Sequence, residues 1–220
     1  MDKRTEKTLR VIKKLARKYG VKRRVRNYPF ITGLIFELFQ SRWPVMESKE
    51  YVDILTSVYS DWNEFRHTPL KYIQEDLDIS VRDIKFVAQL KKYLETIYSV
   101  WFSFKQEVFL DLEATECLSA LSRQGLPKEI TACAICTYLG KPILPLTDPV
   151  LRCIKRLDIF PSKASRKRIR TFFRKRGEEG LLDVYQAYRL FEEHSAALCF
   201  IKEPDCNACF LSRKECRGDE

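Results

Sequence analysis

The chain of 220 residues has no apolar run that approaches the roughly 18–20 residues needed to cross a bilayer. Its first segment, MDKRTEKTLRVIKKLARKYG, lacks the apolar core and the cleavage site of a signal peptide. No internal repeat and no low-complexity segment interrupts the sequence. These absences argue against membrane and secreted proteins, so we expect a cytoplasmic protein that makes no membrane contact.

Strict alternation of apolar and polar residues, which is typical of half-buried strands, is also scarce. Apolar residues recur instead at spacings of three and four, which predicts helices almost throughout an all-α fold. The stretch from Ile143 to Leu146 is expected to be extended. The predicted helices lie around 9–16 and at 30–40, 48–59, 69–75, 80–103, 113–121, 128–139, 150–157, 163–176 and 178–197.

Acidic residues are scarce in two basic segments, one toward each end of the chain. The formal net charge is +10, from 40 Lys and Arg against 30 Asp and Glu. Twelve of the cations fall in 3–26 and eleven in 152–176, opposed within these segments only by Glu6 and Asp158. This placement favours an anionic polymer as partner, because phosphate binding releases condensed counterions. Solvated helix faces are the alternative, and a membrane-surface helix is disfavoured because 3–26 has no Trp or Phe.

The eight cysteines are not expected to form a disulfide framework, because no secretory signal accompanies them. Four of them are scattered through apolar stretches and are interpreted as small core residues. These four are Cys117, Cys133, Cys136 and Cys153.

The other four cysteines lie in the last 22 residues with the spacing C-x6-C-x2-C-x6-C. They are Cys199, Cys206, Cys209 and Cys216. Four thiolates so close in sequence can converge on one metal centre, either a 4Fe-4S cluster or a tetrahedral zinc ion. Zinc sites usually pair two CxxC knuckles, and this segment has one, so the iron–sulfur cluster is the favoured cofactor.

A helix ending in His194 and followed by this cysteine spacing resembles the tail of the endonuclease III group of DNA glycosylases. That family's usual spacing is x6, x2 and x5, and this chain has one more residue before Cys216. The segment GLPKEITACAICTYLGKPILPLTDPVLRC, residues 125–153, resembles the family's helix–hairpin–helix motif and the helix start that follows it. The resemblance is closest to the endonuclease III-related branch that includes 3-methyladenine glycosylases, and it is weak elsewhere in the chain.

The resemblance implies two helical domains, a monomer, and double-stranded DNA as the partner of a nucleoid-associated protein. A six-helix domain with the hairpin would span 29–141, and 1–28 with 142–220 would form a basic domain ending in the iron–sulfur loop. In the hairpin Gly125 is retained, but a proline, which has no N–H for a phosphate, follows where a second glycine is usual. Arg123 and Lys128 are expected to bind DNA through charge instead.

Two positions depart from the family's catalytic pattern. Glu129 occupies the Schiff-base lysine position, and the neighbouring Lys128 is turned away by about 100° on a helix, so no lyase activity is predicted. Thr147 occupies the catalytic aspartate position, and Asp148 comes one residue later. Pro149 favours the first helical position, so Asp148 is predicted to be the helix N-cap. There it would either replace the family's carboxylate or only cap the helix.

A glycosylase also needs residues that hold a nucleotide turned out of the stack. Gln40 matches the family's gap-filling glutamine, or it is simply a polar residue at a helix end. Tyr28, Phe30 and Trp43 could stack on a flipped base, or they could belong to the core. Glu37, the odd residue of an apolar helix, could read the base or reach solvent.

The sequence therefore favours a monofunctional DNA glycosylase that removes a damaged or mispaired base. The alternative is a glycosylase-like protein that binds DNA without catalysis, because Glu129 and Thr147 replace the usual catalytic pair. An RNA-binding or redox-sensing iron–sulfur protein is a third alternative.

Overall fold

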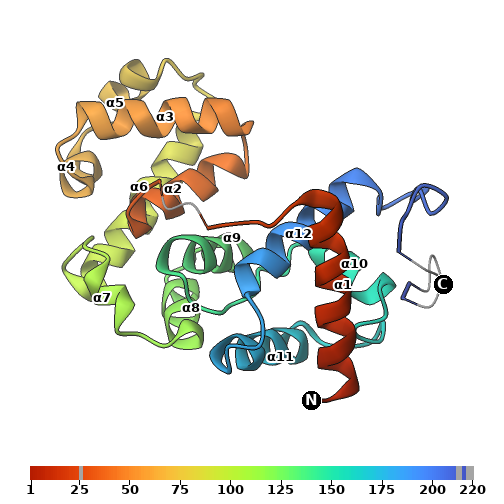
Figure 1. Cartoon of the computed structure of the whole chain (residues 1–220). Coiled ribbons are helices and arrows are strands. Elements are labelled where there is room, and N and C mark those ends of the chain that lie inside the picture. The colour runs from red at the N-terminus through yellow and green to blue at the C-terminus, as the bar shows by residue number, and fades with distance from the viewer. Residues whose placement is uncertain (25–26, 212–214, 217–220) are drawn as a thin grey trace. The chain divides into compact units, whose positions relative to one another are not determined.

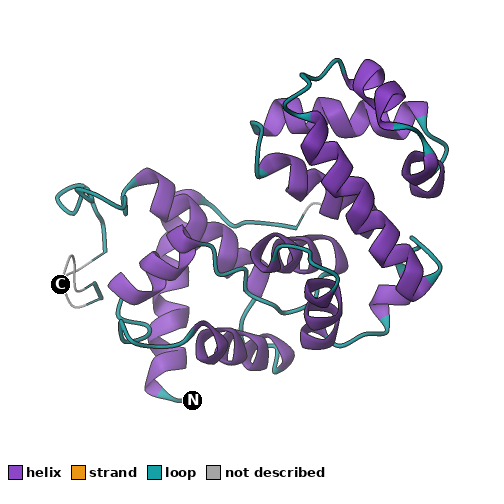
Figure 2. Cartoon of the chain, turned by 180° about the vertical axis from the view of Figure 1, so that it is seen from behind, coloured by secondary structure: helices purple, strands orange, loops and turns teal. Residues whose placement is uncertain are grey.

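The computed structural model describes residues 1–24, 27–211 and 215–216. Over these residues it contains helices and loops and no strand (Figure 2), which confirms the all-α prediction. The chain divides into two compact units, which we call unit 1 (Met1–Val25 with Gly140–Glu220) and unit 2 (Arg26–Leu139). The boundaries expected from the sequence were 29 and 141.

Unit 2 is built around α2 (Phe30–Gln40), which is apolar on nearly every side and packs against α3, α9 and η1. Six of its described α-helices have seven residues or more, and two shorter ones, α4 and α7, carry too little periodicity to be predicted. The other elements of the unit are α3 (Val45–Val58), α4 (Trp62–His67), α5 (Leu70–Leu77), α6 (Ile84–Trp101), α7 (Glu107–Leu110), α8 (Ala114–Arg123), α9 (Lys128–Ala134) and the π-helix η1 (Ile135–Leu139).

Gly33 lets two elements of unit 2 approach closely. It lies in α2, and a Cβ built on it would stand 2.4 Å from the buried ring of Tyr138 in η1. Only a residue without a side chain therefore permits this contact between α2 and η1.

Replacing Gly33 with alanine is expected to lower the free energy of unfolding by about 1–3 kcal/mol. Alanine is the better helix former by up to about 1 kcal/mol, but the clash with the Tyr138 ring outweighs that gain. Urea unfolding of the variant would measure the change. Ser57→Ala, at an exposed position of α3, should stay within about 0.5 kcal/mol of wild type. Equal stability of the Gly33 variant and wild type would contradict the close packing.

Unit 1 joins segments from both ends of the chain. Its helices are α1 (Lys3–Tyr19), α10 (Asp148–Arg156), α11 (Arg166–Glu178) and α12 (Val184–Ala197). Figure 1 shows α1 beside α12, and α12 also packs against α10 and α11. Asp2 caps α1 by accepting from the backbone N–H groups of Arg4 and Thr5, and it pairs with Arg176 of α11 at 2.6 Å.

Predicted and observed helices differ at several boundaries, and two of the differences have a clear local cause. The helix expected at 178–197 is wrong at its start, because Gly180 has a left-handed φ of 69° and Asp183 caps α12 by accepting from Gln186 N–H at 3.0 Å. The helix expected at 128–139 continues as a π-helix from Ile135. Residues 143–146, predicted to be extended, are non-helical, and they are also buried.

None of the helices in the described ranges is both long and apolar enough to span a membrane.

Candidate functional site

The helix–hairpin–helix consists of α8 and α9 joined by residues 124–127. Gly125 has a left-handed φ of 85°, and its N–H donates to the Ser122 carbonyl at 3.1 Å, which closes the turn. Arg123, Gly125 and Lys128 are all exposed, so the loop presents backbone and two cations to solvent.

The start of α10 differs from the prediction. Thr147 is the N-cap residue, with an extended ψ of 157° and no side-chain capping bond, and Asp148 is the first helical residue. The expectation that Asp148 would be the cap is therefore wrong. Pro149 takes the second helical position, which is tolerated because N–H groups of the first turn have no intrahelical partner.

The carboxylate of Asp148 is well exposed and paired with a cation from α11. Its side chain is 83% exposed, and Oδ1 lies 2.5 Å from a guanidinium nitrogen of Arg166. Arg166 also donates to the Leu146 carbonyl, and Arg170 donates to the Leu144 carbonyl at 3.3 Å. Arginines of α11 thus hold the loop before α10 and face its first carboxylate. Sequence reasoning missed Arg166, because nothing in a basic run distinguishes one arginine from its neighbours.

Glu129, which the sequence resemblance aligns with the family's Schiff-base lysine, lies half-buried in the first turn of α9. Its negative charge there is favourable for the helix dipole. The neighbouring Lys128 is exposed and has no side-chain partner among the described residues. The structure therefore gives Glu129 a place consistent with a helix-stabilising role.

The aromatic residues proposed for base stacking have different surroundings. Phe30 is fully buried and packs against the Phe109 ring at 4.9 Å, so it is a core residue. Trp43 is partly exposed, and its ring contacts Tyr51 at 5.3 Å and Phe86 at 5.0 Å. Tyr28 is also partly exposed, and its hydroxyl donates to Asp53 at 3.3 Å. Tyr28 and Trp43 keep surface for a ligand, and Phe30 does not.

Gln40 and Glu37 lie on the last turns of α2. Gln40 is its final residue and is partly exposed. Glu37 is partly exposed too and accepts a hydrogen bond from the Tyr138 hydroxyl at 3.3 Å, across 101 residues of sequence. Burial is the main cause that raises the pKa of Tyr138, so its hydroxyl stays protonated and remains a donor to Glu37. Tyr138 was not foreseen as a partner of this carboxylate.

The four C-terminal cysteines line one cavity in unit 1, as ligands of a common cofactor must. Cys199, Cys206, Cys209 and Cys216 all face it, although 16 residues lie between the first and the last of them. No group of three or more His, Cys, Asp or Glu side chains in the described part of the chain already has the spacing of a metal-ion site. The donor set fits a thiolate-bound cluster in type and number.

Basic side chains of α10 hold the first cysteine. Arg152 donates to the Cys199 carbonyl at 3.1 Å, and Arg156 lies 3.6 Å from its sulfur and donates to the Ile201 carbonyl at 3.2 Å. A hydrogen bond from the Cys153 thiol and the nearby Arg156 lower the pKa of Cys199 below its usual value. Cys199 is thus predisposed to the thiolate form that a metal requires.

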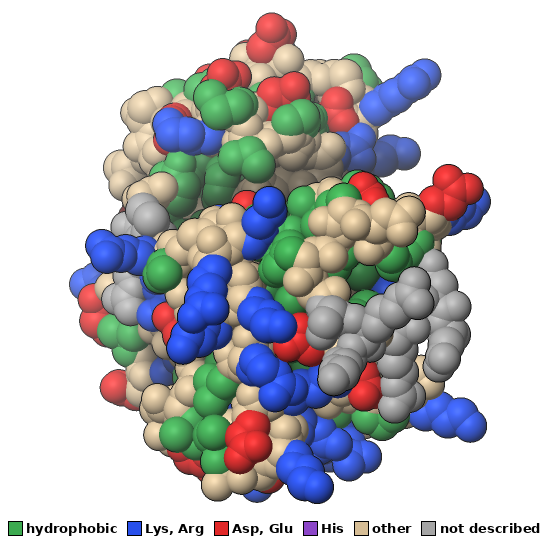
Figure 3. Space-filling model, turned by 45° about the vertical axis from the view of Figure 1, so that its right-hand side comes forward, with side chains coloured by type: hydrophobic (Ala, Val, Ile, Leu, Met, Phe, Trp, Pro, Cys, Tyr) green, Lys and Arg blue, Asp and Glu red, His purple; other side chains and the backbone are tan. Residues whose placement is uncertain are grey.

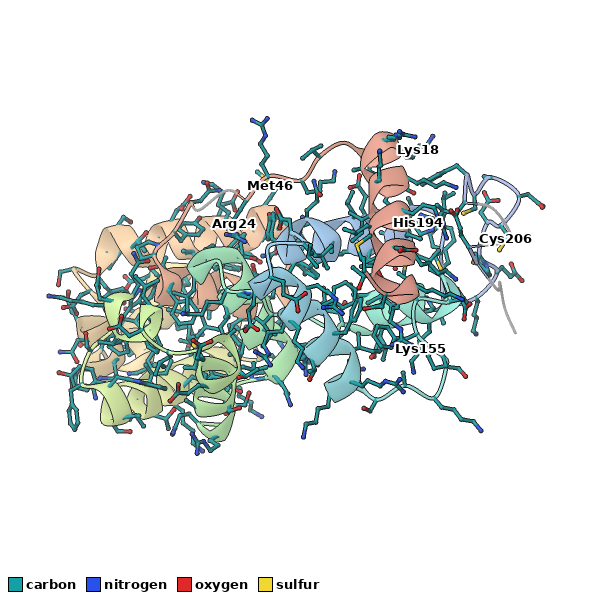
Figure 4. All side chains as sticks on the ribbon, turned by 60° about the horizontal axis from the view of Figure 1, so that its bottom comes forward. Lys18, Arg24, Met46, Lys155, His194 and Cys206 are labelled. Atoms are coloured by element: carbon teal, nitrogen blue, oxygen red, sulfur yellow. The ribbon has the colours of Figure 1, made fainter. Side chains whose placement is uncertain are left out.

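His194 lies beside the cavity at the end of α12 (Figure 4). Its Nδ1 is 3.0 Å from the Tyr19 hydroxyl, and its Nε2 is 4.0 Å from the Cys209 sulfur. Burial lowers the pKa of His194 to about 4, so the ring is neutral near pH 7. A neutral ring between these two groups connects α1 to the cysteine loop.

The four cysteines interpreted as core residues are all buried, which confirms that prediction. They are Cys117, Cys133, Cys136 and Cys153.

Many cations of the two basic segments are engaged within unit 1. In α1, Arg10 and Lys14 both pair with the buried Glu215 of the cysteine loop, at 3.3 and 2.8 Å. Others remain exposed with no side-chain partner among the described residues, and Figure 3 shows Lys and Arg side chains gathered on one face. These exposed cations are Lys3, Lys13, Arg17 and Lys18 of α1 and Lys167, Arg168 and Lys175 of α11.

The sequence also predicts that cations of the cysteine loop contact the DNA backbone, namely Lys202, Arg213, Lys214 and Arg217. Lys202 is exposed. Arg213, Lys214 and Arg217 lie outside the described residues.

No protein-family model matches the chain, and no curated protein matches it significantly by sequence. Solved structures do match its fold. An endonuclease III–DNA complex aligns with a TM-score of 0.71 and 13% identity over 97% of this chain and 95% of that one. A thermostable thymine-DNA glycosylase aligns with a TM-score of 0.69 and 19% identity, over 98% and 97% of the two chains. An 8-oxoguanine glycosylase/lyase of Clostridium acetobutylicum aligns with a TM-score of 0.60 and 17% identity, over 86% and 68%.

Proposed function

We propose that this chain, which has the fold of endonuclease III-like DNA glycosylases, is a monofunctional DNA glycosylase. It removes a damaged or mispaired base from duplex DNA by hydrolysis of the N-glycosidic bond and leaves the sugar–phosphate backbone intact. The observation that carries the proposal is the exposed carboxylate of Asp148 in the first turn of α10.

A carboxylate in this position can do the two things that hydrolytic excision requires. It stabilises the positive charge that develops on the sugar as the base departs, and it accepts a proton from the attacking water. Asp148 is 83% exposed, so a substrate can reach it without rearrangement of the core. Arg166, its ion-pair partner, would move toward a DNA phosphate as the substrate binds.

The absence of a lyase step follows from the residue at the position that resembles the family's Schiff-base lysine. Imine formation with the sugar needs an amine, and Glu129 supplies a carboxylate. Lys128 is the adjacent amine, but its side chain leaves the helix in a different direction. Water is therefore the nucleophile in the proposed reaction.

We assign duplex binding to exposed and partly exposed groups, considering each unit by itself. In unit 2 these are the hairpin residues Arg123, Gly125 and Lys128, with Gln40, Tyr28 and Trp43 near α2 and Glu37 as a reader of the base. In unit 1 they are the exposed cations of α1 and α11. A 4Fe-4S cluster held by the four C-terminal cysteines would supply rigidity to the loop around it. In this proposal the protein acts as a monomer and associates with the nucleoid.

One observation favours a second function, which is DNA recognition without catalysis. Thr147 occupies the cap position at the start of α10, and Asp148 lies one residue further along the helix. The carboxylate of Asp148 is already paired with Arg166. If this ion pair persists on DNA, the carboxylate is not available to the sugar. The protein would then bind a DNA structure and leave its bases in place.

The two functions are separated by an excision assay on duplexes that each carry one alkylated, oxidised or deaminated base. The proposed enzyme releases a free base from at least one duplex, and the strand breaks only after alkali treatment. Strand cleavage without alkali would show lyase activity and contradict the monofunctional assignment. Binding of every duplex with release of no base would support the non-catalytic function.

Lys128→Glu is expected to weaken duplex binding by about tenfold. It should also make the slope of log K against log salt concentration shallower by about 1, the value of one phosphate contact. The reason is that an exposed cation beside the hairpin loop is replaced by an anion. Fluorescence anisotropy of a labelled duplex at several salt concentrations would measure both quantities. Lys71→Glu, an 80% exposed position on α5, is the matched control and should bind as wild type. Equal salt slopes for the two variants would remove Lys128 from the interface.

A further inference from the structure

Unit 2 contains a cavity of about 470 Å³ that none of the candidate site residues lines. It lies among the first turn of α2, the last turn of α3, α4, and the end of α6 with the loop that follows (the elements are labelled in Figure 1). Its volume falls within the roughly 300–1,000 Å³ of small-molecule sites. The cavity is large enough for one nucleotide-sized ligand, and the proposed excision chemistry makes no use of it.

Four aromatic side chains supply the walls of this cavity: Tyr59, Trp62, Tyr98 and Phe104. The indole N–H of Trp62 donates to Thr32 Oγ1 at 3.0 Å, which fixes the plane of that ring. The rings of Tyr98 and Phe104 pack with centroids 5.4 Å apart. Aromatic surface of this kind favours a planar ring as the ligand, because stacked rings gain energy beyond the area they bury.

The walls are held in place from outside the cavity. The guanidinium of Arg66 lies over the Tyr98 ring at 4.4 Å, and the Tyr59 hydroxyl donates to Asp76. Side chains fixed in this way lose little conformational freedom when a ligand binds. The cavity is therefore preorganised and does not depend on ordering by its occupant.

Polar groups give the cavity a second kind of selectivity. Asp61 and Lys105 both line it, so one anion and one cation face the same space. The Oδ1 atom of Asp61 accepts from the backbone N–H groups of Asn63 and Glu64 at 2.8 and 2.7 Å, which orients the carboxylate. Lys105 is exposed and has no side-chain partner among the described residues. The ligand should thus carry a hydrogen-bond donor and a negative charge in addition to its ring.

We propose that this cavity binds a nucleotide, with the base between the aromatic walls, its exocyclic amino group toward Asp61 and its phosphate at Lys105. Base–aromatic stacking contributes about 1–3 kcal/mol per base in known nucleic-acid sites. An ammonium group is an established phosphate partner, and a carboxylate accepts from base amino groups. A free nucleoside monophosphate and one nucleotide of a single strand share this chemistry.

The test is titration of the 220-residue chain with dAMP, monitored by calorimetry and by tryptophan fluorescence. Lys105→Ala is expected to weaken dAMP binding by about tenfold and to leave deoxyadenosine binding unchanged, because the nucleoside lacks the phosphate. Lys71→Ala, an exposed lysine of the same unit that does not line the cavity, is the matched control and should bind as wild type.

Phe104→Ala tests the stacking wall and is expected to weaken both dAMP and deoxyadenosine by about 5- to 100-fold. Phe104 is partly exposed, so the variant should fold, which thermal unfolding would check. A short oligo(dA) strand distinguishes the two sources: saturable binding of dAMP indicates a free nucleotide, and binding of the strand alone indicates a nucleotide within it. The proposal would be overturned if neither dAMP nor the oligo(dA) strand binds at about 10 mM, with the strand concentration counted in nucleotides. Wild-type affinity in both variants would do so as well.

Discussion

Conversion of Asp148 to asparagine is expected to lower the rate of base excision by about 10²–10⁴-fold and to leave duplex affinity nearly unchanged. Asparagine keeps the shape of the side chain but loses the charge that stabilises a cationic sugar and the site that accepts a proton. Because the side chain is 83% exposed, the change creates no cavity in the core. Single-turnover excision and anisotropy on the same duplex would measure the two quantities separately.

Two further variants make this result specific. Glu178→Gln removes another exposed carboxylate of unit 1, paired with Arg174 at 2.6 Å, and should leave excision unaffected. Thr147→Asp places a carboxylate at the N-cap of α10, a position that favours aspartate. In the Asp148→Asn background it is expected to restore part of the excision rate. Undiminished excision by Asp148→Asn alone would remove this carboxylate from the reaction.

Replacing Cys206 with serine is expected to abolish the brown absorbance of the proposed 4Fe-4S cluster and to weaken duplex binding by about tenfold or more. Cys206 is exposed, so serine disturbs no apolar packing and the effect reports on the cofactor. With one ligand lost, the loop that Arg156 and Glu215 connect to α10 and α1 would lose its rigid centre. Iron content, absorbance after anaerobic purification and anisotropy are the measurements.

Cys136→Ala is the matched control for the cysteine loop, because Cys136 is a buried core residue of unit 2. It should lower stability by about 1 kcal/mol and keep the full iron content. Wild-type protein purified anaerobically without iron would contradict the cluster. If Cys206→Ser loses the cluster but binds the duplex with wild-type affinity, the proposed cluster has no role in DNA binding.

The helices and the hairpin could be predicted because their signals are local. The apolar periodicity of α2 and the glycine at 125 each act within a few residues. The short helices α4 and α7 were missed because six and four residues cannot display a helical period. At the start of α10 two adjacent residues, Thr147 and Asp148, are both good caps, and sequence alone favoured the wrong one.

Contacts between distant residues could not be predicted in the same way. The pairing of Asp148 with Arg166 and of Glu37 with Tyr138 depends on how helices pack, not on spacing. The basic segments predicted a positive surface but not which cations form ion pairs within the protein. Arg10 and Lys14 pair with Glu215, whereas Arg17 remains exposed. The aromatic cavity of unit 2 also combines residues from four separate segments, so no local pattern indicates it.

The composition of unit 1 from both ends of the chain has a consequence for biosynthesis. Residues 26–139 form a compact unit that is complete while the ribosome is still translating the rest. Helix α1 is synthesised before α12, which covers its apolar face, and its Lys14 is synthesised before its partner Glu215. A nascent chain stalled near residue 180 would therefore expose an unpaired basic helix, which would be a target for chaperones or for premature association with nucleic acid.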